Sequence, residues 1–196
     1  MTCSAVDPES LARIRRRIFL ALFVALAVAL RTFEYLLPSP APWFRPGFAN
    51  IFTLAALFLY GGRAAWTVTL ARVVIAALVV GSLFSPGFFL SLAGGVCAVT
   101  LMTGAHAPAG RHLGPVGISV LGALGHVSGQ LVVAWLLLVR SAGLWHLYPV
   151  FVLFALGAGV VNGIAADLLL ELLRAHPAFA AAFQAPSAAT SPAEKR

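Results

Sequence analysis

Charged residues are scarce in this sequence. Asp, Glu, Lys and Arg together make up only 10% of its 196 residues, whereas soluble globular domains contain about 25%. Hydrophobic residues make up 61%, and the mean hydropathy is +0.96. These values exclude an ordinary soluble domain and indicate that lipid surrounds most of the chain.

Cysteine and acidic residues are also few. Cys3 and Cys97 lie far apart and belong to no C-x-x-C pair or histidine cluster, so neither a disulfide framework nor a metal site is indicated. The sequence contains no P-loop, no G-x-S-x-G or H-E-x-x-H motif and no paired-aspartate motif. We therefore expect that the chain is not an enzyme and uses no cofactor.

The charges that are present are mostly positive, with a formal net charge of +7. In a soluble protein this excess would suggest nucleic-acid binding. Here the basic residues lie at the ends of apolar runs, where they determine membrane topology, so no nucleic-acid partner is expected. The four arginines within residues 13–17 precede the first apolar run and are typical of a cytoplasmic anchor that also contacts anionic lipid.

The apolar runs predict an all-α integral membrane protein of about six transmembrane helices, because a backbone in lipid must satisfy its own hydrogen bonds. The predicted spans are 18–37, 48–61, 64–84, 87–106, 116–139 and 148–173. They lie between a basic segment, 1–17, of which residues 1–12 are expected to be disordered, and a disordered tail, 174–196. The second span reaches only about 20 Å at 1.5 Å per residue, so we expect it to be tilted, enclosed by protein or re-entrant.

Six spans place both termini on one side of the membrane. That side then carries the arginines of residues 13–17 with Arg63, Arg111 and Arg174, whereas the other side carries only Arg45 and Arg140. The positive-inside rule therefore predicts cytoplasmic termini. A cleaved signal peptide is the alternative at the amino end, but the first apolar run continues past the alanines that imitate a cleavage site.

Small residues recur at helical spacing in three spans. Ala21, Ala25 and Ala29 form one stripe on the first span. The stripe docks a partner protein, packs against the chain's own helices or only reflects an alanine-rich composition. The G-x-x-x-G pairs at Gly125 and Gly159 are expected to serve internal packing.

Polar side chains inside the predicted spans suggest an outward-facing pocket, because such residues are costly in lipid. Arg31 and Glu34 lie one turn apart near the outer end of the first span. The candidate substrate-binding residues are Arg31, Glu34, Asn50, His126, Gln130 and Asn162. The alternatives are an interfacial ion pair for the first two and interhelical hydrogen bonds for the others.

Two further charges, Arg72 and Asp167, lie at similar predicted depths on the third and sixth spans. An unpaired charge at that depth would raise the free energy of the folded protein by roughly several kcal/mol. We therefore predict that they form a structural ion pair.

Four segments of the sequence resemble a known bacterial family. They are Phe-Ala-Asn-Ile-Phe-Thr-Leu at 48–54, Ser-Leu-Ala-Gly-Gly at 91–95, Gly-Ile-Ser at 117–119, and Gly-Ala-Leu-Gly-His at 122–126, which continues to Gln130. Between about Arg31 and Arg174 the chain resembles the Gx transporter family, also called heptaprenyl diphosphate synthase component I.

That family is similar to the S components of energy-coupling-factor (ECF) transporters, six-helix proteins of the bacterial cytoplasmic membrane that capture small molecules such as vitamins. The resemblance implies that Ala21, Ala25 and Ala29 dock onto a membrane T subunit, which works with ATPase subunits. The alternative is a membrane accessory of isoprenoid or quinone metabolism, or of flavin- or quinone-linked electron transfer.

Overall fold

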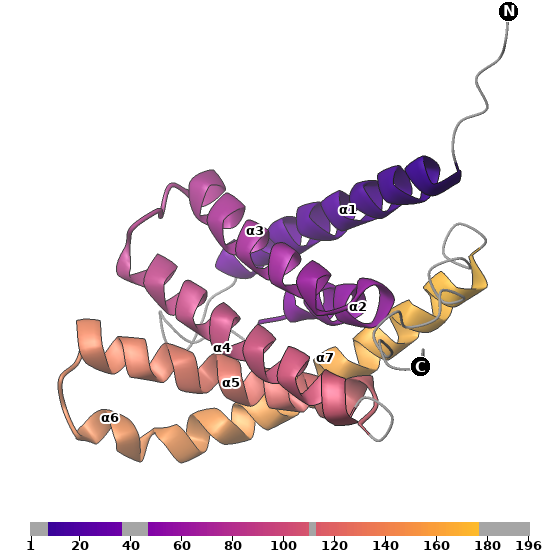
Figure 1. Cartoon of the computed structure of the whole chain (residues 1–196). Coiled ribbons are helices and arrows are strands. Elements are labelled where there is room, and N and C mark those ends of the chain that lie inside the picture. Colours follow the sequence, from indigo (N-terminus) through magenta and orange to yellow (C-terminus); the bar gives the residue numbers. More distant parts are fainter. Residues whose placement is uncertain (1–7, 37–46, 110–112, 177–196) are drawn as a thin grey trace, which may run out of the picture.

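The described part of the chain consists of helices without any strand. The computed structural model describes residues 8–36, 47–109 and 113–176 (Figure 1). The helices are α1 (Pro8–Leu36), α2 (Asn50–Tyr60), α3 (Gly62–Val80), α4 (Pro86–Ala109), α5 (Pro115–Leu137), α6 (Gly143–His146) and α7 (Tyr148–Ala175). The predicted all-α fold is confirmed.

Four helices of the described ranges, α3, α4, α5 and α7, are long and apolar enough to cross a membrane. The chain is therefore a multi-pass membrane protein. The helix α1 is also long, with 29 residues, and its apolar part follows the arginines of residues 13–17. The helix α2 has only 11 residues, about 17 Å at 1.5 Å per residue, so it is too short to cross a hydrocarbon core of about 30 Å by itself.

The first helix begins earlier than the sequence suggested. Residues 8–12 belong to α1, so the expectation that residues 1–12 are disordered is wrong for this part, whereas residues 1–7 lie outside the described residues. Proline is tolerated in the first turn, where its missing N–H would have no helical acceptor. The arginines that follow are good helix formers, so the helix continues through them into the apolar run.

The short helix α2 occupies the centre of the bundle and contacts each of the five long helices. Most of its residues are buried. The buried hydroxyls of Thr53 and Thr69 lie 3.1 Å apart and join α2 to α3. Protein therefore encloses α2, which was one of the three arrangements expected for this short apolar segment.

Both ends of α2 meet α1. At the start of α2, the N–H of Phe48 donates to Glu34 near the end of α1 over 2.7 Å. At its end, Nη2 of Arg16 donates to the carbonyl of Tyr60 over 3.3 Å. The chain then turns into α3 through Gly61, whose φ of +82° favours glycine. The two helices therefore run antiparallel, and α2 returns the chain toward the arginine-rich end.

Close contacts at glycines join α4, α5 and α7. A Cβ atom at Gly125 would lie 2.9 Å from the carbonyl oxygen of Cys97, and one at Gly159 would lie 2.9 Å from Cα of Val120. Only glycine permits backbones to approach this closely. The prediction that the G-x-x-x-G pairs of α5 and α7 serve internal packing is confirmed.

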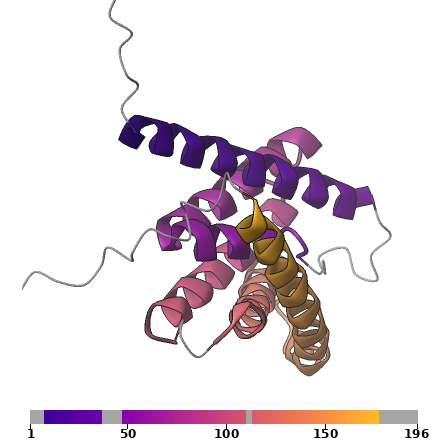
Figure 2. The same ribbon diagram turned by 90° about the vertical axis from the view of Figure 1, so that its right-hand side faces the viewer.

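The helix α1 lies along one side of the bundle, next to α2 and α3 (Figure 2). The first turn of α1 and the last turn of α7 lie on the same side of the molecule, at the right of Figure 1. This agrees with termini on one side of the membrane. Residues 177–196, most of the predicted disordered tail, lie outside the described residues.

A candidate ligand pocket

A cavity opens at the end of the bundle where α1 ends and α2 begins. It measures about 70 Å³, counted as the space open to the centres of water-sized molecules. One water needs roughly 10–15 Å³ of such space, so the cavity accommodates several waters or a small ligand. Its polar lining consists of Ser82, between α3 and α4, and of residues from four helices, Arg31, Glu34, Arg72, Ser91, His126 and Gln130.

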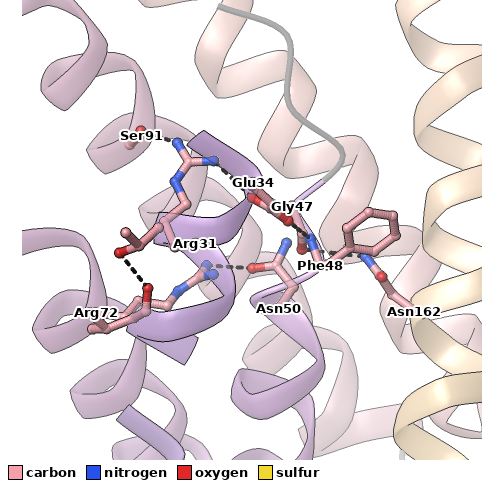
Figure 3. A network of polar contacts seen from close by, with 10 residues as sticks. Arg31, Glu34, Gly47, Phe48, Asn50, Arg72, Ser91 and Asn162 are labelled. Carbon is pink, nitrogen blue, oxygen red and sulfur yellow. Dashed lines mark hydrogen bonds and ion pairs between the residues drawn. The ribbon is translucent and has the colours of Figure 1, made fainter. Parts of the chain in front are cut away.

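Arg31 and Glu34 of α1 form one wall of the cavity, and Figure 3 shows their polar contacts. Nη1 of Arg31 lies 3.1 Å from one carboxylate oxygen of Glu34, and its Nη2 donates to Oγ of Ser91 on α4 over 2.7 Å. The other oxygen of Glu34 accepts the hydrogen bond from Phe48. Both carboxylate oxygens of Glu34 are therefore engaged, and the hydrogen bond from Arg31 to Ser91 joins the end of α1 to α4.

Arg72 of α3 approaches the same cavity. It is only 5% exposed, and its Nη2 donates to Oδ1 of Asn50 over 2.5 Å (Figure 3). Its Nε is buried and has no hydrogen-bond partner in the ranges that the structure describes. The predicted ion pair between Arg72 and Asp167 is not formed, because α2, which packs against both α3 and α7, presents Asn50 to the guanidinium.

His126 and Gln130 line the cavity from one face of α5, and each is 6% exposed. The imidazole has glycines on two sides. A Cβ atom at Gly94 of α4 would lie 2.9 Å from the ring, and one at Gly47 would lie 3.8 Å from it. Both ring nitrogens are buried and have no hydrogen-bond partner of good geometry among the described residues.

Asn50 and Asn162 lie next to the cavity without lining it. Nδ2 of Asn162 on α7 donates over 3.4 Å to the carbonyl of Gly47, the residue with φ of +68° that precedes α2. Asn50 holds Arg72. Of the six candidate binding residues, the structure therefore places Arg31, Glu34, His126 and Gln130 at the cavity wall and the two asparagines behind it.

Three residues of the site were missed from the sequence. Arg72 was recognised as a buried charge but was assigned to another partner. Ser91 and Gly94 lie one turn apart on α4, within the Ser-Leu-Ala-Gly-Gly segment that carried the family resemblance. That segment was the available signal, since a glycine one turn from a serine on an apolar helix leaves room for a neighbouring side chain.

The alanine stripe of α1 is not covered by another described helix. Ala21, Ala25 and Ala29 are exposed, and they line an apolar groove between α1 and α3 whose other wall includes Thr67 and Ile75. Packing inside the chain does not account for this exposure, whereas docking of a partner and an alanine-rich composition both agree with it.

A comparison with protein families matches residues 23–169, about three quarters of the chain, to heptaprenyl diphosphate synthase component I. The chain belongs to this family. The resemblance to it inferred from four short segments is therefore confirmed. Searches of curated proteins and of solved structures gave no match.

The match to the component I family spans the helices that build the cavity, from within α1 to within α7. In this family member, no group of three or more His, Cys, Asp or Glu side chains in the described ranges could hold a metal ion. What the cavity offers instead is a set of hydrogen-bonding groups and two guanidinium groups.

Proposed function

We propose that this member of the component I family is the substrate-binding component of an ECF-type uptake transporter in the bacterial cytoplasmic membrane. The observation that carries the proposal is the polar cavity within a membrane bundle. Polar groups buried in a membrane protein are costly unless they serve an ion, a ligand or one another, and both nitrogens of His126 have no partner among the described residues.

The position of the cavity supports capture from outside the cell. The cavity lies where α1 ends, whereas the arginines of residues 13–17 lie near the other end of α1. The positive-inside rule assigns the arginine-rich end to the cytoplasm. The cavity then faces the exterior, from which an uptake protein takes its substrate.

The exposed alanine stripe of α1 supports docking to a partner. Small residues at i, i+4 and i+8 allow another helix to approach closely in lipid. Because the sequence contains no P-loop, energy for uptake comes in this proposal from a membrane T subunit with its ATPase subunits. The groove beside Ala25 is the surface on which the T subunit docks.

Co-purification in mild detergent tests this proposal. Ala25→Leu fills the groove and should abolish recovery of the T and ATPase subunits with the tagged chain. Gly157→Leu is the matched control, because a Cβ atom at Gly157 on α7 meets nothing within 4 Å, and it should leave the complex intact. Recovery of the same partners with both variants would refute the docking surface, and their absence from the unaltered chain would refute the transporter.

The description of the family favours a second candidate, a membrane accessory of an enzyme that makes prenyl diphosphates. In that case the polar residues fasten helices together. The same co-purification separates the two functions, since an accessory brings a prenyl diphosphate synthase in place of ATPase subunits.

A further inference from the structure

Arg72 forms no ion pair with a carboxylate of the described residues. The guanidinium is 5% exposed, and its hydrogen bond goes to the neutral amide of Asn50. Burial of a charge is costly unless an opposite charge accompanies it. A partner for Arg72 must therefore come from another group at the cavity or from a bound molecule.

The cavity itself does not supply that partner. The charged groups that line it are Arg31 and Glu34 from α1 and Arg72 from α3, while α4 contributes Ser91 and α5 contributes His126 and Gln130. Glu34 is already engaged through both oxygens, by Arg31 and by the N–H of Phe48. Among the described lining residues, two arginines and one glutamate leave one positive charge without a carboxylate.

We infer that the pocket binds a small monocarboxylate, whose carboxylate group takes the place of the missing counter-ion beside Arg72. This inference deepens the proposed function and rests on it. A single negative charge balances the lining, whereas a dianion such as phosphate exceeds it. The planar fork of a guanidinium also matches the two oxygens of a carboxylate.

The other residues that line the cavity indicate what the rest of the bound acid looks like. His126 offers two unpartnered ring nitrogens, so the acid has room for one further hydrogen-bonding group near α5. Val73, Ala76, Val80 and Phe88 line the cavity from the second half of α3 and the start of α4. A short apolar part fits against these side chains, and the cavity of about 70 Å³ limits the acid to a small one.

Matched acids and amides test the inference on the purified full chain in detergent. The probes are lactate, hexanoate and benzoate, each compared with its primary amide, together with inorganic phosphate, and the readout is the unfolding temperature as a function of probe concentration. At least one acid should raise the unfolding temperature in a saturable manner, while its amide and phosphate should not.

Arg72→Gln examines the role of the charge, because glutamine is polar but neutral. The variant should unfold at the same temperature as the unaltered chain or higher, and it should bind the acid at least about tenfold more weakly, the loss expected for one charge-assisted hydrogen bond. Arg72→Lys keeps the charge without the fork and should retain the preference for acid over amide. A purely structural arginine would instead give a lower unfolding temperature in Arg72→Gln and no response of the unaltered chain to acids.

Other results would refute monocarboxylate binding but would leave the proposed transport function unaffected. Equal stabilisation by an acid and its amide, or stronger stabilisation by phosphate, would mean that the pocket binds ligands of another class. No response to any probe would also reject the monocarboxylate. The transporter proposal is decided separately, by whether T and ATPase subunits co-purify.

Discussion

Nη2 of Arg72 donates a hydrogen bond to Oδ1 of Asn50 over 2.5 Å. The bond joins the middle of α3 to the first residue of α2, the central helix of the bundle. It lies directly behind the cavity, so it both fastens the core and orients the guanidinium that lines the pocket. Fold and binding site therefore share this contact.

Asn50 is expected to control both stability and charge at this contact. Asn50→Leu removes the partner of a buried guanidinium and should lower the free energy of unfolding by about 2 kcal/mol, the usual range for a hydrogen bond to a charged group. Asn50→Asp supplies a carboxylate and should be more stable than Asn50→Leu, but it should lose the response to acids because Arg72 is then neutralised. Unfolding in detergent, with and without benzoate, measures both effects.

Identical stability of the leucine and aspartate variants would contradict this account. A double-mutant cycle with Arg72→Gln serves as the control, because the two residues are in contact and their effects should not add.

Gly94 is expected to be required for the position of the imidazole. A Cβ atom there would lie 2.9 Å from the ring of His126 and 2.8 Å from Cγ of Gln130. Gly94→Ala should therefore displace these side chains and cost about 1–3 kcal/mol, as overpacking of a core usually does. The measurement is the free energy of unfolding together with acid binding.

Gly104→Ala on the same helix is the matched control. A Cβ atom at Gly104 meets nothing within 4 Å, and alanine stabilises a helix interior by up to about 1 kcal/mol relative to glycine. This variant should be as stable as the unaltered chain or slightly more so. Equal effects of the two substitutions would show that Gly94 acts through helix propensity and not through the space it leaves.

The topology can be tested by labelling single cysteines in a chain whose Cys3 and Cys97 are replaced. Ser141 precedes α6 and Ala175 ends α7, and both are exposed. Because the arginine-rich end is predicted to be cytoplasmic, a membrane-impermeant maleimide should label Ser141→Cys in intact cells and should label Ala175→Cys only after the membrane is opened. The reverse pattern would place the cavity on the cytoplasmic side and remove the basis for uptake from outside.

Sequence reasoning grouped some of the cavity-lining residues as the structure places them. Arg31 and Glu34 are three residues apart on α1, and His126 and Gln130 are four residues apart on α5. The helical repeat alone therefore places the two members of each pair on the same face of their helix. Arg72 and Asp167 were matched by depth on different helices, and this failed. Depth along a helix does not fix the direction in which a side chain points, since each residue turns the helix by about 100°.

By itself, the sequence determined that the chain is an all-α membrane protein of the component I family and where most of its helices lie. Lipid imposes these features locally, because each apolar segment must satisfy its own backbone hydrogen bonds. Only the tertiary structure decided that the short helix α2 lies at the centre, that Asn50 meets Arg72, and that His126 lies beside Gly94 and Gly47. These contacts depend on how the helices are rotated about their axes and how they pack against one another. Glycines on several helices jointly determine that packing.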